Sequence, residues 1–356
     1  MTTDFHALLD VFRTHLEAEL ASWLAERRRD AAGYLGEELV VIDTIERLLG
    51  AGGKRLRPAL VYFSYKSCGG ETEASVLPLA LATELLHTYL LIHDDIMDRA
   101  ASRRGQPSAH RWFADRHRHH GWAGDGEHYG RSMAIHAGDL AHTWADQLVA
   151  GIEVEPGLRL ELQRTYFAMC REVIDGQYLE MHLGFREPSE TELAQVLRLK
   201  SGLYSVERPI QLGAVMAMAG ERRRSGLGRY GRALGEAFQL RDDILGLFGD
   251  STEVGKPVGD DLREGKFTFL IHHTLERASE AEAQRVRGAL GQAHLEASEV
   301  EAVSRIVRES GGLEAVETMI ERRSREALEA LDGLDLTPAG RAFFLGLVDY
   351  VARRNH

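Results

Sequence analysis

Acidic side chains cluster in two places where the surrounding sequence is strongly apolar. Asp94, Asp95 and Asp98 follow one long apolar run, and Asp242 and Asp243 interrupt another much later in the chain. On a helix, the first and third acids of the earlier cluster are four residues apart and share one face. Like charges there repel one another and also oppose the helix dipole. Because this arrangement has no structural advantage of its own, it indicates function.

Hard divalent cations would remove the electrostatic problem that these acids create. Magnesium takes oxygen ligands and is usually held by one or two carboxylates together with substrate phosphates. Either cluster alone is more often an exposed helix end, but two clusters in apolar helices favour a metal site. If the two helices face each other, their carboxylates could hold the metal between them, as in other helix bundles.

Basic residues near these acids match an anionic ligand. Lys54 and Arg57 lie at a glycine-rich break before a predicted helix, where the helix N-terminus favours anions. His87 shares the helix face of the first cluster, although a lone histidine there is more often a core residue. The other candidate cations are Arg103, Arg104, Lys200, Lys256 and Lys266. Carboxylates for metal and arginines for phosphate describe a diphosphate site. No Walker or Rossmann phosphate motif occurs.

A helical scaffold must position these side chains. Apolar residues recur with a period of 3.6, and alternating strand patterns are essentially absent. The pattern predicts helices over about 5–27, 37–49, 59–68, 74–99, 107–120, 129–150, 157–184, 189–201, 203–219, 226–249 and 266–278, with more after 281. No linker divides the chain. We therefore predict an all-α fold of ten or more helices, forming a single domain over 1–356.

The composition narrows the classes of function. The chain has 356 residues, of which 44% are hydrophobic, so it can bury a sizeable core. Its net charge of −12 provides no basic field for nucleic acid or anionic lipid. Two cysteines without metal-type spacing predict no disulfide framework and a reducing, cytoplasmic location. The N-terminus does not look like a secretory signal, and the apolar runs look too short or too interrupted to span a bilayer.

Six motifs together resemble the trans-isoprenyl diphosphate synthase family, which includes geranylgeranyl and farnesyl diphosphate synthases. In chain order they are GGKRLRP (52–58), ELLHTYLLIHDDIMDRAASRRG (84–105), HAGDLAHTWA (136–145), KSGLYSVERP (200–209), FQLRDDILGLFGD (238–250) and VGKPVGDDLREGK (254–266). The resemblance implies an all-α isoprenoid synthase fold around a central cavity, usually in a homodimer. It also implies a magnesium-dependent, head-to-tail condensation of an allylic diphosphate with isopentenyl diphosphate.

The resemblance also implies a role for each candidate residue. Asp94 and Asp98 would bind two magnesium ions and Asp242 a third, with Asp95 and Asp243 supporting them. The allylic diphosphate would be held by Arg103, Lys200, Lys256 and Lys266. Isopentenyl diphosphate would be held by Lys54, Arg57, His87 and Arg104. Gln239 and the hydroxyl of Ser201 would lie beside the developing carbocation.

The sequence departs from the family pattern at two positions, where activity is still expected. Two other positions, just before the first acidic cluster, bear on the length of the product. Gly246 stands where the second motif often has its last aspartate, and Ser201 replaces a common threonine. Tyr89 and Leu90 occupy the positions that help to set the floor of the chain cavity in this family. An aromatic residue followed by a smaller one resembles the producers of twenty-carbon chains, so we expect geranylgeranyl diphosphate.

Other interpretations remain open from the sequence. A farnesyl or longer-chain polyprenyl synthase is the nearest alternative. A class I terpene cyclase would not need the isopentenyl diphosphate residues, and a non-catalytic subunit would be expected to lose its acids. The histidine-rich segment 110–130 could bind a transition metal, but a polar helix and loop is the simpler interpretation.

Overall fold

The computed structural model describes residues 5–35, 39–249 and 258–353. These residues form two compact units that each contain parts from separate stretches of the chain. The described residues of 5–63 and 70–163 form the first unit, and those of 64–69 and 164–353 form the second. The single domain that the sequence predicts therefore stays a prediction.

The first unit is a group of helices with one short hairpin. Its elements are α1 (Phe5–Leu35), α2 (Val40–Gly50), the first part of α3 (Leu56–Ser67), α4 (Glu73–Met97), β1 (Ser102–Arg103), β2 (Gln106–Pro107), α5 (Ala109–His119), α6 (Gly126–Ala150) and the first turns of α7 (Pro156–Leu183). The two strands pair antiparallel, with Arg103 opposite Gln106. The hairpin reverses the chain directly after the first acidic cluster.

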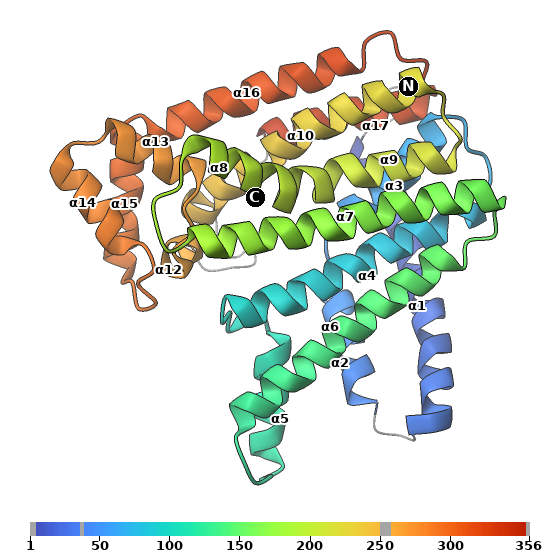
Figure 1. The fold of residues 1–356 in the computed structure, drawn as a ribbon, viewed down its shortest axis with the longest axis horizontal. Helices are drawn as coiled ribbons and strands as arrows, with labels where there is room; N and C mark the ends of the chain where they lie inside the picture. The colour runs from blue at the N-terminus through green and yellow to red at the C-terminus, as the bar shows by residue number, and fades with distance from the viewer. Residues whose placement is uncertain (1–4, 36–38, 250–257, 354–356) are drawn as a thin grey trace. The chain divides into compact units, whose positions relative to one another are not determined.

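Helix α4 is the central helix of this unit. Its buried residues lie all round its circumference, which is typical of a core helix rather than a surface one. Helix α6 packs along it, as Figure 1 shows, and helix α5 packs on α6. Small residues permit this close packing: a Cβ atom at Gly138 would overlap the ring of His93 on α4. The acids at the end of α4 therefore belong to a tightly held helix.

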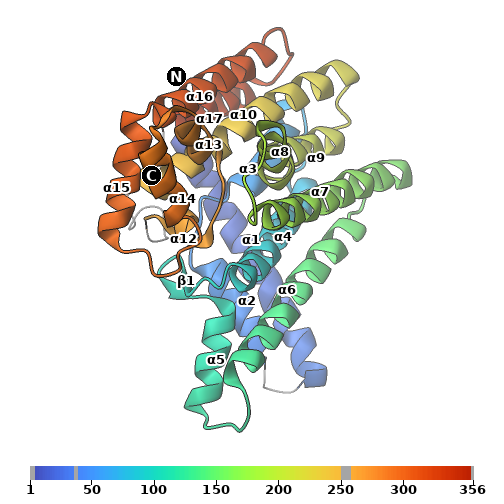
Figure 2. The same cartoon turned by 60° about the vertical axis from the view of Figure 1, so that its left-hand side comes forward.

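The second unit is built around α10. Its elements are the remainder of α7, α8 (Glu190–Val196), the π-helix η1 (Leu197–Glu207), α9 (Arg208–Met216), α10 (Glu221–Phe248), α12 (Asp260–Glu264), α13 (Phe269–Arg277), α14 (Glu280–Ala289), α15 (Ala297–Glu309), α16 (Gly312–Ala330) and α17 (Pro338–Arg353). Helix α10 contacts η1, α9, α16 and α17, and Figure 2 shows α16 beside it. It carries the second acidic cluster near its C-terminal end.

Glycines let η1 pack against α10 at backbone distance. A Cβ atom at Gly231 would lie 2.8 Å from the Cα atom of Glu207, and one at Gly235 would lie 2.8 Å from the Cα atom of Gly202. Both glycines have the backbone of η1 directly opposite them. Because π-helices are uncommon and occur frequently at functional sites, this element marks the segment that carries Lys200 and Ser201.

The all-α fold class is confirmed, and most predicted helices lie within a few residues of the observed ones. Sequence periodicity did not predict the hairpin, because strands of two residues carry no periodic signal. Cys68 and Cys170 are buried thiols. Helix α4 is long and apolar enough to cross a membrane by length and composition, so the expectation that no run has that length was wrong. However, 67% of its most apolar window is buried inside the protein, as in a core helix.

Candidate active site

The first acidic cluster lies at the C-terminal end of α4. Asp94 and Asp95 belong to the last turn, and Asp98 is the C-cap residue, whose backbone N–H donates to the carbonyl of Asp94. The side chain of Asp95 is 1% exposed. Three carboxylates thus meet at a helix end, where the backbone carbonyls are already negative.

Arg103 returns from the hairpin to contact these acids. Its Nε donates to Oδ1 of Asp95 at 2.8 Å. Its Nη2 lies 2.6 Å from the same oxygen and 3.4 Å from Oδ2 of Asp94. Burial lowers the pKa of Arg103, but the carboxylates of Asp95, Asp94 and Asp98 outweigh it and the pKa lies above its ordinary value. The hairpin therefore holds a guanidinium permanently charged beside the acidic cluster.

Cationic residues from two other segments of the chain contact this part of the unit. Nη1 of Arg57 is 3.3 Å from Nε2 of His87. Arg104 donates to the carbonyl oxygen of Gly52, and its guanidinium packs over the Cα atom of Gly53. One pocket is lined by Leu48, Ala51, Glu84, His87, Thr88, Leu91, Ile92, Asp95, Arg103 and Arg104. The structure thus brings together His87 and both arginines that the sequence nominated for two different diphosphates.

His87 is held in its neutral form. Burial, followed by the charges of Arg57, Arg104 and Arg103, lowers its pKa well below the ordinary value of 6.5. A neutral imidazole can donate one hydrogen bond without adding to the positive charge. The cationic groups around it can then be balanced by an anion.

His87→Gln is expected to flatten the dependence of stability on pH. Below about pH 6.5 the unfolded chain binds a proton on this histidine that the native protein does not, so the stability is present above that pH and lost as the pH falls. Urea unfolding of the metal-free protein is measured at pH 7 and pH 5. The free energy of unfolding should fall less between these pH values in the variant than in wild type, by up to about 1.4 kcal/mol per pH unit. Exposed His294, changed to Gln, is the control. Equal slopes in His87→Gln and wild type would contradict the prediction.

The two positions proposed to limit product length lie on α4. The ring of Tyr89 stacks on His142 of α6, with centroids 4.6 Å apart and planes at 12°. It also meets the edge of His93 at 4.7 Å. Leu90 is half-buried. The structure therefore fixes the orientation of Tyr89, whereas the role of both residues in product length stays a prediction.

The second acidic cluster lies on α10. Nε2 of Gln239 donates to Oδ1 of Asp243 at 2.8 Å. Burial, and then the neighbouring carboxylates of Asp261 and Asp242, raise the pKa of Asp243 to about 8, although the hydrogen bond from Gln239 opposes this. Such crowding of carboxylates fits a divalent cation, which would stabilise their ionised forms. The donor set at both clusters is therefore suited to magnesium.

Gly246, which stands in place of the last aspartate of the second motif, lies against the carboxylate of Asp261. A Cβ atom at Gly246 would overlap Oδ2 of Asp261. Asp243, Gly246, Asp261 and Lys266 line one pocket. Lys266 lies 3.8 Å from Asp261 and also pairs with Glu264. The carboxylate of Asp261 thus occupies the space beside Gly246, and the sequence motif alone did not nominate it.

Lys200 and Ser201 are carried by η1. Nζ of Lys200 pairs with Glu180 of α7, and Ser201 is 7% exposed. A Cβ atom at Gly176 of α7 would lie 2.7 Å from the Cα atom of Lys200. Glu180 and Gly176 were not predicted as part of the site, because their contacts join residues distant in sequence. Lys256, also nominated, lies outside the described residues.

Gly176→Ala is expected to displace η1 and lower turnover by about 10²-fold, because misplacement by about 1 Å can have that effect. The overpacking should also lower the free energy of unfolding by about 1–3 kcal/mol. Steady-state rates and thermal melting measure the two effects. Gly288→Ala on α14, where a Cβ atom meets nothing within 4 Å, is the matched control. Full activity in Gly176→Ala would show that the close contact does not set the position of Lys200.

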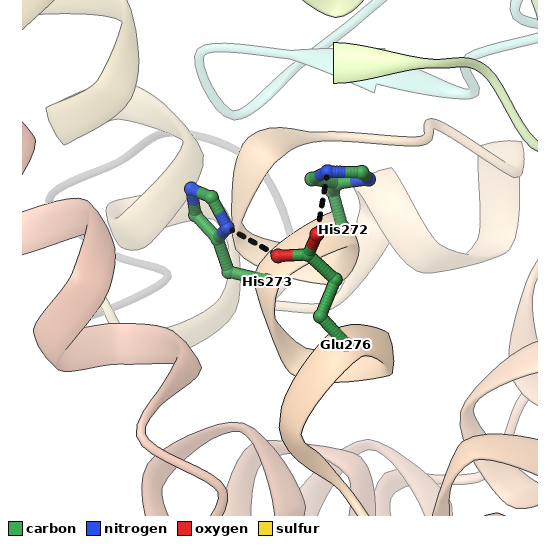
Figure 3. Close-up of side chains that lie close together, drawn as sticks. All are labelled: His272, His273 and Glu276. Carbon is green, nitrogen blue, oxygen red and sulfur yellow. Dashed lines mark hydrogen bonds and ion pairs between the residues drawn. The ribbon is translucent and has the colours of Figure 1, made fainter.

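A separate group of possible metal ligands lies on α13. Figure 3 shows the carboxylate of Glu276 between two histidine rings. Oε1 lies 3.6 Å from Nε2 of His272, and Oε2 lies 3.1 Å from Nδ1 of His273. Arg277 also approaches Oε2, at 3.3 Å. Because three side chains already share this carboxylate, we interpret the group as a hydrogen-bonded network at the surface of α13.

The histidine-rich segment contains several aromatic contacts. The ring of His117 lies 5.9 Å from Trp122 and 5.4 Å from Tyr129. His120 stacks on Trp122 with centroids 4.9 Å apart. These contacts join the end of α5 to the start of α6, which agrees with the interpretation as a polar helix and loop.

Comparisons with known proteins identify the family to which the chain belongs. A family model described as polyprenyl synthetase matches residues 39–307. The geranylgeranyl diphosphate synthase of Methanosarcina mazei is 34% identical over 312 residues, covering 87% of this chain and 88% of the relative. The farnesyl diphosphate synthase of Geobacillus stearothermophilus is 35% identical over 293 residues, covering 75% of this chain and 92% of the relative.

The fold also matches solved structures. A geranylgeranyl pyrophosphate synthase from Corynebacterium glutamicum, crystallised with isoprenyl diphosphate and magnesium, has a TM-score of 0.93 and 33% sequence identity. The match covers 97% of this chain and 99% of that one. The resemblance inferred from the six motifs is thereby confirmed.

Proposed function

The chain belongs to the polyprenyl synthetase family, and we propose that it is a transferase that condenses an allylic diphosphate with isopentenyl diphosphate to give geranylgeranyl diphosphate. The observation that carries the proposal is the arrangement around the end of α4. Three carboxylates and Arg103 lie at the helix end, next to a pocket lined by His87 and Arg104. A reaction between two diphosphates requires acids that bind metal for one substrate and cations that bind the diphosphate of the other.

The acids would hold magnesium, with two ions on Asp94 and Asp98 and a third on Asp242. Bound there, magnesium would neutralise the negative charge that grows on the departing diphosphate. Asp95 and Asp243 lie beside these ligands in sequence. Asp95 pairs with Arg103, and Asp243 accepts a hydrogen bond from Gln239, so each would orient a group that we propose to contact the substrate.

The cationic residues would form two groups, one for each diphosphate substrate. Arg103, Lys200, Lys256 and Lys266 would hold the allylic diphosphate, and their charges stabilise it as it leaves. Lys54, Arg57, His87 and Arg104 would hold isopentenyl diphosphate, keeping its double bond close to the allylic carbon. Gln239 and Ser201 would offer polar atoms next to the positive charge that forms on that carbon. The diphosphate oxygen that departs would accept the final proton.

The product length is proposed from Tyr89 and Leu90. Relatives of similar identity are named for geranylgeranyl and for farnesyl products, so identity alone does not choose between them. An aromatic side chain at the first position and a smaller one at the second support the twenty-carbon chain. A farnesyl or longer-chain product remains the alternative.

We propose further that the protein is a cytoplasmic homodimer and that both units belong to one isoprenoid synthase domain, because the family model extends across both. Helix α7 supports the dimer through an exposed apolar stripe that continues just past its end. The stripe consists of Phe167, Ile174, Tyr178, Met181 and Phe185, which are 44–92% exposed. Their spacing places them on one helix face, and an apolar surface of this kind favours burial against a second copy. Sedimentation equilibrium measures this directly.

Product analysis tests the proposed reaction. The purified chain is incubated with magnesium, labelled isopentenyl diphosphate and dimethylallyl, geranyl or farnesyl diphosphate, and the dephosphorylated products are sized. Incorporation of label into a twenty-carbon alcohol is expected. Consumption of the allylic substrate without isopentenyl diphosphate would instead indicate a terpene cyclase. A chain inactive alone but active with a partner would indicate a non-catalytic subunit.

A further inference from the structure

A buried ion pair joins two of the segments that carry the residues proposed to bind isopentenyl diphosphate. Glu84 lies on α4, one turn before His87, and pairs with Arg55 from the glycine-rich break between α2 and α3. Their side chains are 4% and 2% exposed. Neither residue was nominated from the sequence, and neither has a role in the reaction proposed above.

Arg55 holds an unusual backbone conformation. Its φ is 50°, in the left-handed region that side chains other than glycine seldom adopt. Such a conformation costs free energy and persists where surrounding contacts enforce it. Arg55 pairs with Glu84, donates to the carbonyl oxygen of Leu49 at 2.6 Å, and lies 3.8 Å from the carboxylate of Glu17. These contacts turn Arg55 inward.

The inward direction of Arg55 bears on the positions of Lys54 and Arg57. Lys54 and Arg57 lie close to it in sequence and stay half-buried, while Arg55 is buried. Arg57 then meets His87, which lies on the same helix as Glu84. The buried pair thus joins the segment that carries Lys54 and Arg57 to the helix that carries His87.

Arg104 contacts the same 51–55 loop through a hydrogen bond. Its backbone is also left-handed, with φ 52°, and its guanidinium donates to the carbonyl oxygen of Gly52. Glu84 and Arg104 line the same pocket as His87. Glu84 thus pairs with Arg55, and its charge also opposes the lowering of the pKa of Arg104 by burial.

The cost of this arrangement indicates that it serves a purpose other than stability. A buried ion pair loses much of its hydration, and well-packed apolar residues in its place are often as stable or more so. Two left-handed arginines add strain. A binding loop, however, gains from being held in one shape before its ligand arrives, since less ordering is then required on binding.

We infer that Glu84 and Arg55 are positioning residues for isopentenyl diphosphate, which hold the 51–55 loop so that Lys54, Arg57 and Arg104 meet the diphosphate together. This inference rests on the proposed function. It concerns one of the two substrates, because the contacts of the pair lead to the loop and to His87, whereas Arg103 is attached to the acidic cluster.

The test compares the Michaelis constants of the two substrates in Glu84→Gln and Arg55→Lys. Glutamine keeps the shape of Glu84 without its charge, and lysine keeps the charge of Arg55 without its second hydrogen bond. The KM for isopentenyl diphosphate is expected to rise about tenfold in each variant. The KM for geranyl diphosphate should stay within about twofold of wild type. Calorimetric titration with isopentenyl diphosphate should show the same loss without turnover.

Glu46→Gln is the matched control, because it removes a half-exposed partner of Arg28 in the same unit and should change neither constant. An unchanged KM for isopentenyl diphosphate in both variants would overturn the inference, as would an equal rise in both constants. Loss of folding in both variants, seen by circular dichroism, would also overturn the inference, because the pair would then be required for folding rather than for positioning the loop. A wild-type chain that does not incorporate isopentenyl diphosphate would instead overturn the proposed function.

Discussion

Asp98→Ala is expected to lower turnover by about 10²–10³-fold with magnesium present, which is the effect of removing a group that stabilises charge in the transition state. Asp98 caps α4 and belongs to the cluster whose charge raises the pKa of Arg103. Without it, two carboxylates remain on the helix end and the set of oxygen ligands is incomplete. The magnesium concentration that gives half-maximal rate should rise as well.

Asp115→Ala provides the control for that substitution. Asp115 lies on α5 in the same unit, is half-exposed and pairs with Arg118, so its loss removes the same charge from the surface. Incorporation of labelled isopentenyl diphosphate and thermal melting are measured for both variants. Near-normal incorporation of label by Asp98→Ala would show that the first acidic cluster is not part of the active site. A fall in rate with an equal fall in Asp115→Ala would attribute the effect to net charge.

Much of the fold was predictable because helical periodicity is a local signal. The central position of α4 follows from a run that is apolar on every side, and the structure buries it all round. The π-helix η1 was not predictable in this way. Its hydrogen bonds differ from those of an α-helix, but its apolar spacing over 11 residues does not clearly differ. What distinguishes it is the backbone contact with α10 and α7, which periodicity does not report.

The site was predictable to the extent that its residues break local rules. Acids in apolar helices and cations at a glycine-rich break were visible from the sequence alone. Glu84 was not, because a single acid in an apolar helix looks the same whether its partner is a distant arginine or solvent. Asp261 was hidden for a related reason: its significance depends on the space left by Gly246, which lies in another helix.

These omissions share a physical cause. The residues nominated from the sequence are those expected to touch substrate or metal, and their types reveal their chemistry. The residues that hold them in place act through contacts between segments far apart in sequence. Gly176, Glu180 and Arg55 are examples, since each fixes or pairs with a residue on another element. Their importance therefore appears only with the structure.

Leu90→Phe is expected to shorten the main product from twenty carbons towards fifteen. The substitution adds a ring at the position after Tyr89, whose own ring packs against His142 and His93. Because Leu90 is half-buried, the larger side chain should be accepted at a cost in stability of about 1 kcal/mol. Growth of the chain would then stop one isopentenyl unit earlier. Chromatography of the dephosphorylated products measures the change.

Tyr89→Phe separates this effect from a general disturbance of α4. It keeps the ring that stacks on His142 and removes the hydroxyl alone, so the product should stay at twenty carbons. If Leu90→Phe left the product unchanged while remaining active, Leu90 would not lie at the floor of the chain cavity. If both variants shortened the product, the position of α4 rather than the size of one side chain would set the length. A shorter product from Leu90→Phe alone would connect the two residues before the first acidic cluster to the identity of the product.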